Sequence, residues 1–226
     1  MTSSLPHAVL FDMDGTLVDT EGLWLEAEIE VMGALGSSWT DEDQELCLGG
    51  PLERVTEHMR ARSGSDTDPV LIGEMLLDAM ESRLWARPPQ WRPGAREVIV
   101  DCHEHRVPTA LVSASWTRLI RAVQGAIDAQ FGRSPFDVVV AGDDVTHSKP
   151  HPQPYLEAAR LLGVDAAQCL ALEDSPTGVV SARDAGCRVV AIPHLAPVEH
   201  LGTAVVGSLS GRGVHDLWAL ARASGG

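Results

Sequence analysis

Two carboxylates separated by one residue, Asp12 and Asp14, are the side chains of this chain best placed to do chemistry. They follow the apolar run Ala8–Phe11 and precede Gly15-Thr16. On a strand, residues i and i+2 point the same way, so both acids should converge beyond the strand's carboxyl end, where open α/β sheets bind ligands. Crowded carboxylates are unfavourable unless a cation or a reaction uses them. The pair therefore predicts a functional site at the end of the first strand.

The use of lysine is the second unusual feature. The chain has 17 Lys and Arg residues, but only Lys149, within Ser148-Lys149-Pro150-His151-Pro152, is a lysine. An ammonium group is a compact charge whereas a guanidinium is a planar fork, so a lone lysine in a proline-bounded segment indicates a position that needs the compact charge.

The net charge is strongly negative, at −15. It disfavours nucleic acid and anionic membranes as partners, because both require a basic face. An anionic substrate would also be repelled unless a local cation reversed the sign. The charge balance therefore points to a bound divalent metal acting together with Lys149.

The size and composition are those of an ordinary globular protein. The 226 residues are 44% hydrophobic and 22% charged, enough for one domain with an insert or for two domains. No apolar run reaches transmembrane length, and residues 1–7 lack the features of a signal peptide. We expect a cytoplasmic protein whose four cysteines, which show no Cys-x-x-Cys spacing, are free thiols.

Short apolar runs alternate with helical stretches through most of the chain. The alternation predicts an α/β fold with a doubly wound parallel sheet. Buried strands are expected at residues 8–11, 109–112, 138–140, 169–172 and 189–192. Helices are expected at residues 95–105, 117–130, 154–162 and 176–185, the last beginning at the capping sequence Asp174-Ser175-Pro176 and ending at Gly186.

Residues from about 19 to 92 differ, because they show no strand pattern. Helical periodicity occurs at 23–35, 52–62 and 70–85, and Pro88-Pro89 and Pro93-Gly94 mark the return to the sheet. We therefore expect a core domain of residues 1–18 and 92–226, with a small helical domain of residues 19–91 inserted directly after the aspartate pair. An insert that enters and leaves beside a site is well placed to act as a lid.

Four motifs together resemble the haloacid dehalogenase-like (HAD) superfamily, specifically its phosphatases with a helical C1 cap. They occur in the family's order over essentially the whole chain. The motifs are DMDGTLVDTE at 12–21, LVSAS at 111–115, SKPHP at 148–152 and LEDSPTG at 172–178. The resemblance implies a Rossmann-like core with an inserted cap, and hydrolysis of a phosphomonoester through an aspartyl-phosphate.

The same resemblance implies a role for each motif residue. Asp12 would be the nucleophile and Asp14 the general acid and base; position alone does not separate these two roles. Ser113 and the backbone N–H of Ala114 would bind a phosphoryl oxygen. Lys149 would balance the charge of the nucleophile and hold the phosphoryl group.

A Mg²⁺ site is also implied. Asp12, the backbone carbonyl of Asp14 and Asp174 would be ligands, and Glu173 would contribute directly or through a water molecule. Hard oxygen ligands suit Mg²⁺, which neutralises charge on phosphoryl oxygens. Glu173 and Asp174 also stand where acidic residues favour a helix N-terminus.

The cap is expected to select the substrate. DTEGLW at 19–24 looks like the phosphatases of sugar and polyol phosphates, including deoxyglucose-6-phosphate and hexitol phosphatases. Trp24 is expected either to line the mouth of the site or to pack in the cap core, and Gly50, in the cap loop, to face the site. The expected partner is a small-molecule phosphate ester, and the expected state is a monomer.

Other members of the superfamily are alternatives. β-Phosphoglucomutase has a cap histidine where Trp24 stands and a basic residue in the cap loop, which here has none before Arg54. Phosphonoacetaldehyde hydrolase needs a cap lysine, which is missing, and a true dehalogenase normally lacks the acid at position 14. A catalytically silent binding protein on this fold is a further alternative, although the nucleophile and metal ligands are all present.

Overall fold

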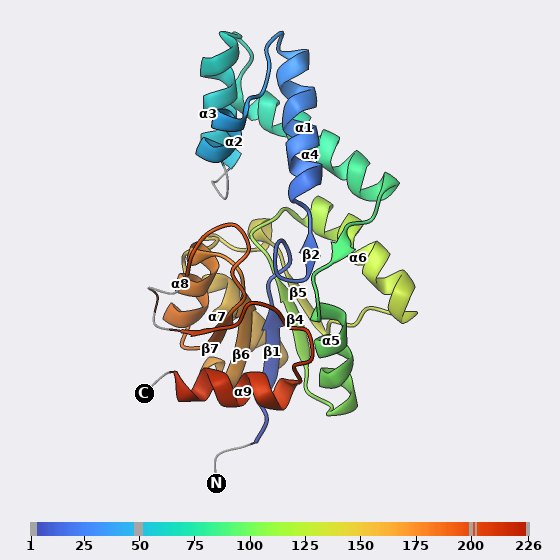
Figure 1. The fold of residues 1–226 in the computed structure, drawn as a ribbon, viewed down its shortest axis with the longest axis vertical. Coiled ribbons are helices and arrows are strands. Elements are labelled where there is room, and N and C mark those ends of the chain that lie inside the picture. Colours follow the sequence, from blue (N-terminus) through green and yellow to red (C-terminus); the bar gives the residue numbers. More distant parts are fainter. Residues whose placement is uncertain (1–3, 48–51, 199–200, 202, 225–226) are drawn as a thin grey trace. The chain divides into compact units, whose positions relative to one another are not determined.

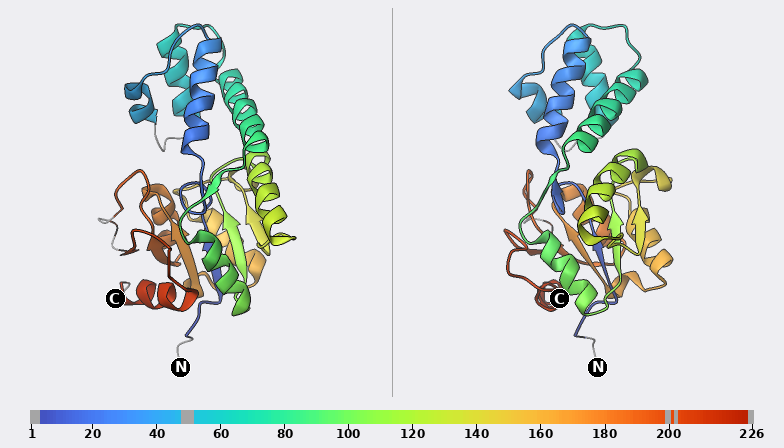
Figure 2. Two further views of the ribbon diagram at one scale, coloured as in Figure 1. Left: turned by 45° about the vertical axis from the view of Figure 1, so that its right-hand side comes forward. Right: turned by 90° about the vertical axis from the view of Figure 1, so that its right-hand side faces the viewer.

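The computed structural model describes residues 4–47, 52–198, 201 and 203–224. The chain forms two compact units, shown in Figures 1 and 2. The first, here called the sheet unit, comprises Met1–Asp19 and Pro89–Gly226. The second, the helical unit, comprises Thr20–Pro88.

A six-stranded parallel sheet forms the centre of the sheet unit (Figure 1). In spatial order its strands are β5 (Val138–Val140), β4 (Thr109–Val112), β1 (Ala8–Phe11), β6 (Cys169–Glu173), β7 (Arg188–Ala191) and β8 (Ala204–Val205). The chain adds β4 and β5 on one side of β1 and then crosses to β6 on the other. This reversal makes the end of β1 a topological switch point, where doubly wound sheets bind ligands.

Helices cover both faces of this sheet (Figure 2). One face is covered by α7 (Gln153–Leu162) and α8 (Pro176–Asp184). The other is covered by α5 (Ala95–Glu104), α6 (Thr117–Phe131) and α9 (Val214–Ala223). Single 3₁₀ turns occur at Gly142–Asp144 and Ala166–Gln168. The predicted doubly wound α/β sheet is confirmed.

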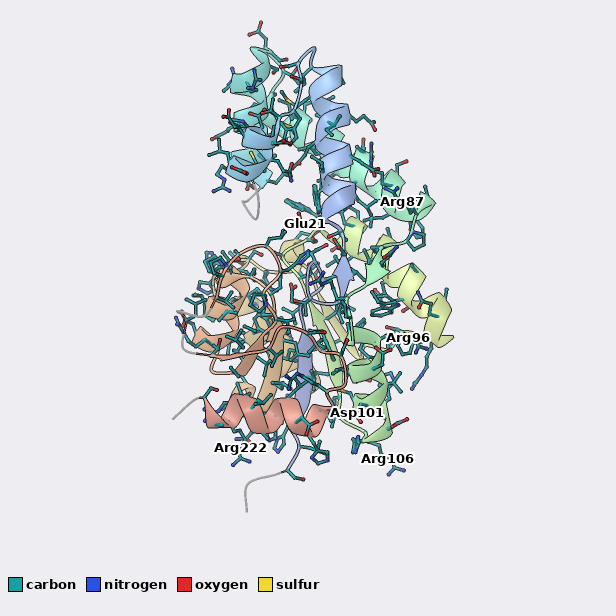
Figure 3. All side chains as sticks on the ribbon, viewed as in Figure 1. Glu21, Arg87, Arg96, Asp101, Arg106 and Arg222 are labelled. Carbon is teal, nitrogen blue, oxygen red and sulfur yellow. The ribbon has the colours of Figure 1, made fainter. Side chains whose placement is uncertain are left out.

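A hydrogen bond joins two helices of one layer, and apolar packing holds the opposite layer against the sheet. Asp101 of α5, labelled in Figure 3, accepts a 2.6 Å hydrogen bond from the N–H of Val214 at the start of α9. On the opposite face, Leu10 and Val112 of the sheet share a buried cluster with Tyr155 of α7. Full burial of a Leu or Val side chain is worth roughly 1.5–3 kcal/mol. The buried cluster therefore packs α7 against the central strands of the sheet.

The start of α8 matters for the site, because it follows directly after β6. Ser175 is the N-cap, and its side chain accepts a hydrogen bond from the N–H of Gly178, while Pro176 occupies the first turn. Gly186, with φ of 90°, follows the last turn. Both ends agree with the capping signals in the sequence.

The described residues of the helical unit form four helices. They are α1 (Glu21–Ala34), α2 (Asp41–Cys47), α3 (Leu52–Ser63) and α4 (Pro69–Ala86). Asp68 caps α4 by accepting from the N–H of Val70 at 2.8 Å. Arg87, labelled in Figure 3, donates to Glu26 of α1 at 2.6 Å, so an exposed ion pair adds to the apolar contact between α1 and α4.

The structure corrects one prediction and adds elements that the sequence did not indicate. Residues 19–92 were expected to contain no strand, yet β2 (Val18–Asp19) pairs antiparallel with β3 (Gln90–Trp91) in the sheet unit. Strands of two residues are too short to show alternation. The predicted strand at 189–192 begins one residue earlier, at Arg188. Helices α2 and α9 and strand β8 were not predicted.

Two further expectations concern the whole chain. All four cysteines, Cys47, Cys102, Cys169 and Cys187, are buried free thiols, as predicted. Among the described residues, no helix combines the length and the apolar character that a membrane span requires.

Candidate active site

Four of the predicted catalytic and metal-binding residues lie at the carboxyl ends of three neighbouring strands. Asp12 comes directly after β1, Ser113 after β4, and Glu173 and Asp174 at the end of β6. The N–H of Asp12 donates to the carbonyl of Leu172 at 3.0 Å, and the N–H of Ser113 donates to that of Val140 at 3.0 Å. The sheet hydrogen bonding therefore continues into the site and fixes its backbone.

Lys149 is the hub of this cluster. Its Nζ donates to Asp12 Oδ1 at 2.7 Å, Glu173 Oε1 at 2.6 Å and the carbonyl of Val112 at 2.9 Å, which uses all three ammonium donors. The side chain is only 4% exposed. Burial by itself would lower the pKa of Lys149, but the charges of Asp12 and Glu173 outweigh it and raise the pKa, so the lone lysine stays charged.

Glu173 is wholly buried and accepts hydrogen bonds on both oxygens. Besides the Lys149 contact, Oε1 accepts from the hydroxyl of Tyr155 at 2.6 Å, and Oε2 accepts from Ser175 Oγ at 3.3 Å. Burial raises the pKa of Glu173, and the Lys149 charge opposes that rise. The carboxylate is therefore oriented by three donors.

Asp174 completes a group of three carboxylates. Oxygens of Asp12, Glu173 and Asp174 all lie within 4.8 Å of one another. Burial, followed by the negative charges of Asp12 and Glu173, raises the pKa of Asp174 to about 9. Asp12 Oδ2 is buried without a hydrogen-bond partner among the described residues. A cation bound here would offset the repulsion, so the cluster could hold a metal ion with hard oxygen ligands.

Two glycines leave space for these carboxylates. Gly15 has φ of 82°, and a Cβ at this position would overlap Asp174 Oδ2. A Cβ at Gly178 would likewise collide with the Glu173 carboxylate. Glycine has no such atom and tolerates positive φ, which explains why the motifs contain glycine at both positions.

Asp14 connects the first motif with the second. Its Oδ2 accepts from the hydroxyl of Ser115 at 2.8 Å, and the N–H of Ser115 donates to Ser113 Oγ at 3.0 Å. Ser113 is buried whereas Ala114 is exposed. Asp14, Ser115 and Ser113 therefore belong to one hydrogen-bonded turn that contains Ala114.

The structure brings together the predicted residues of the sheet unit, and these are Asp12, Asp14, Ser113, Ala114, Lys149, Glu173 and Asp174. Trp24 belongs to the helical unit, half-buried in the first turn of α1. Gly50 lies outside the described residues. The predicted roles of Trp24 and Gly50 in substrate binding stay predictions.

Sequence reasoning missed Ser115 and Tyr155. Nothing in the second motif indicated that Ser115 would reach Asp14. Tyr155 carried a signal that was overlooked, because it is the only tyrosine of the chain and follows shortly after the only lysine.

Known proteins match this chain over most of its length. Residues 9–192 match the family described as haloacid dehalogenase-like hydrolase. Hexitol phosphatase B of Escherichia coli (strain K12) is 33% identical over 189 residues, which cover 82% of this chain and 83% of that protein. Fructose-1-phosphate phosphatase YqaB of the same strain is 32% identical over 183 residues, covering 80% and 94%.

A solved structure agrees in fold as well. The crystal structure of a CbbY mutant from Rhodobacter sphaeroides in complex with xylulose-(1,5)bisphosphate matches with a TM-score of 0.81 and 28% identity, covering 94% of this chain and 99% of that one. The family that the four motifs predicted is thereby confirmed: the chain belongs to the haloacid dehalogenase-like hydrolases.

Proposed function

We propose that this protein is a Mg²⁺-dependent phosphatase that hydrolyses a small sugar or polyol phosphate through an aspartyl-phosphate on Asp12. The observation that carries the proposal is the buried contact between Asp12 and Lys149 within a group of three carboxylates at adjoining strand ends. Phosphatases among the relatives support the reaction class. The residues of the cluster have distinct roles in the two steps of this reaction.

Asp12 is the nucleophile. Lys149 holds its Oδ1 at 2.7 Å, while its Oδ2 has no hydrogen-bond partner among the described residues. One oxygen is thus fixed and the other can attack phosphorus. The new bond joins Asp12 to phosphorus, and the bond from phosphorus to the substrate oxygen breaks.

Asp14 is the general acid and base. The contact with Ser115 at 2.8 Å holds its carboxyl group. Asp14 gives its proton to the leaving oxygen, and it then takes a proton from the water that attacks phosphorus in the aspartyl-phosphate. The second step breaks the bond to Asp12 and releases inorganic phosphate.

The negatively charged phosphoryl oxygens need hydrogen-bond donors and a positive charge beside Asp12. Ser113 Oγ and the N–H of Ala114 supply hydrogen bonds, and Lys149 supplies the charge. Preorganised donors of this kind act without reorganisation during the reaction. The formal charge of −15 makes such a local reversal of sign necessary.

Mg²⁺ fits the carboxylate group, because oxygens of Asp12, Glu173 and Asp174 lie within 4.8 Å of one another and hard oxygen ligands suit this ion. Asp12, Asp174 and the backbone carbonyl of Asp14 would hold the ion, and Glu173 would contribute through water, since both its oxygens already accept hydrogen bonds. When bound, Mg²⁺ neutralises charge on the phosphoryl oxygens.

The helical unit is proposed to be the cap that selects the substrate. The chain leaves the sheet unit after Asp19, shortly after the aspartate pair, and returns at Pro89. Relatives named for hexitol phosphates and fructose-1-phosphate, and a relative bound to xylulose-(1,5)bisphosphate, favour a phosphorylated carbohydrate. Trp24 and Gly50 are the proposed cap contacts. Cytoplasmic location and a monomeric state remain predictions.

The test is phosphate release from a panel of hexose, pentose, hexitol and nucleoside monophosphates, with and without Mg²⁺, using Asp12→Asn as the inactive control. We expect Mg²⁺-dependent release that is greatest with a sugar or polyol phosphate. Conversion of a hexose phosphate only when a sugar bisphosphate is added would instead establish a mutase. Binding without turnover would establish the silent binding protein.

A further inference from the structure

The only lysine and the only tyrosine of the chain meet across one buried carboxylate oxygen. Lys149 Nζ and the hydroxyl of Tyr155 each donate to Glu173 Oε1 at 2.6 Å. The lysine Nζ also lies 5.1 Å from the centre of the tyrosine ring, within the range of a cation–π contact. Tyr155 is wholly buried, so neither contact is exposed to solvent.

Tyr155 is suited to act as a fixed donor. Burial, and then the charges of Glu173 and Asp12, raise the pKa of Tyr155 well above its usual value, so the hydroxyl keeps its proton. The ring belongs to the buried cluster between α7 and the sheet, where Leu10 and Val112 also lie. The packing of α7 therefore determines the position of the hydroxyl.

We propose that Tyr155 is a positioning residue that holds Lys149 against Asp12 through Glu173, an inference that rests on the proposed function of Asp12 and Lys149. The hydroxyl fixes Glu173 Oε1, Glu173 fixes the ammonium, and the tyrosine ring, 5.1 Å from Nζ, limits the movement of the ammonium. Without the hydroxyl, the Glu173 carboxylate can rotate and draw the ammonium away from Asp12. Tyr155 itself touches no substrate.

The first test is kinetic and uses Tyr155→Phe, which keeps the ring and removes the hydroxyl. Loss of one hydrogen bond to a charged acceptor should lower kcat about tenfold, with KM changed less than about twofold. Thr109→Val is the matched control. It also removes a wholly buried hydroxyl with a 2.6 Å hydrogen bond, but to the carbonyl of Pro135, at the other end of β4.

The second test is spectroscopic and needs no turnover. Because the chain has one lysine and one tyrosine, selective isotope labelling gives one side-chain NMR signal set for each. In the wild type, we expect nuclear Overhauser contacts between the Lys149 Hε protons and the Tyr155 ring. Tyr155→Phe should shift the Lys149 ammonium signal and accelerate its hydrogen exchange, and Thr109→Val should leave both unchanged.

The two tests together decide the proposal. The proposal is supported if Tyr155→Phe has a lowered kcat and an altered Lys149 signal and Thr109→Val has neither. An unchanged Lys149 signal, an unchanged kcat, or an equal loss of kcat in both variants overturns it. If Tyr155→Phe does not fold, missing contacts between Lys149 and Tyr155 in the wild type overturn it. If the wild type releases no phosphate, the proposed function fails, and the NMR signal alone decides whether Tyr155 positions Lys149.

Discussion

The two units bury carboxylates to similar extents but surround them differently. In the helical unit, Asp43 is 5% exposed and lies in the first turn of α2, where it accepts from the N–H and the hydroxyl of Thr40 at 2.9 and 2.7 Å. His58 contacts its other oxygen at 2.7 Å. These contacts, with the Thr40 hydroxyl foremost, hold the pKa of Asp43 far below its usual value. Asp43 is a satisfied helix-capping residue.

In the sheet unit, Asp12 is 7% exposed and lies among other acids. Three carboxylates share one region there, and burial and repulsion raise the pKa of Asp174 to about 9. Burial alone therefore does not mark a chemical group in this molecule. Unfavourable clustering marks it, because such an arrangement persists only where a cation or a reaction uses it.

The largest expected effect separates these two aspartates. Asp12→Asn should lower kcat/KM by roughly 10³-fold or more, because the amide is a poor nucleophile. Asp43→Asn should leave kcat/KM within about twofold but lower the free energy of unfolding by about 2 kcal/mol, because the amide holds the Thr40 and His58 contacts less well. Phosphate release and urea unfolding measure the two effects. Equal losses of activity in the two variants would show that Asp12 is no more important for the reaction than Asp43.

The next effect concerns the type of charge beside Asp12. Lys149→Arg should lower kcat/KM by about 10²-fold, because a forked guanidinium does not fit three acceptors arranged around one ammonium. Arg160→Lys is the control, because Arg160 forms an exposed ion pair with Glu157 on α7. This variant should leave kcat/KM unchanged. Steady-state kinetics of both variants measure the effect. Wild-type activity in Lys149→Arg would show that Lys149 is not part of the active site.

A smaller effect tests the space beside Asp174. Gly15→Ala should raise the Mg²⁺ concentration needed for half-maximal activity about tenfold, because the new Cβ displaces Asp174. Gly186→Ala is the matched control, since Gly186 also has positive φ but a Cβ added there would meet nothing within 4 Å. A Mg²⁺ titration of activity compares the two variants. The same rise in the half-maximal Mg²⁺ concentration in both would show that backbone strain, and not displacement of Asp174, causes the effect.

The smallest effect on activity concerns Glu28, the second buried carboxylate of the helical unit. Burial, together with Glu21, raises the pKa of Glu28 from 4.5 to about 7. Between these pH values the folded state holds a proton that the unfolded state has lost, so stability falls as pH rises, by up to about 3 kcal/mol.

Glu28→Gln should remove this fall and leave kcat unchanged. Thermal unfolding of wild type and variant from pH 4.5 to 8 measures the difference between them, which isolates Glu28 from other titrating groups. Parallel pH dependence in the two proteins would show that Glu28 is not the group responsible.

The sequence predicted the elements that carry a strong apolar pattern. Strands β1, β4, β5, β6 and β7 were predicted because each is almost continuously apolar, as buried parallel strands require. Helix α2 was missed because its seven residues, DEDQELC, are mainly polar, and β2 and β3 were missed because each has two residues.

The candidate site divides in the same way. Asp12, Lys149 and Asp174 could be predicted because their motifs state residue type and spacing together. Ser115 could not, and the sequence marked Tyr155 only as the single tyrosine near the single lysine. The contacts of these two residues with Asp14 and Glu173 join segments far apart in the sequence. Such contacts depend on how α7 and the strand ends pack, which local patterns do not contain.

The aspartyl-phosphate on Asp12 is tested most directly by finding the phosphoryl group on the enzyme. Wild-type protein turning over its best substrate with Mg²⁺ is quenched rapidly in acid, reduced with borohydride and analysed by peptide mass spectrometry. We expect an acyl phosphate that borohydride converts to homoserine at position 12. Recovery of the phosphoryl group on another residue, or undiminished phosphate release by Asp12→Asn, would contradict this claim.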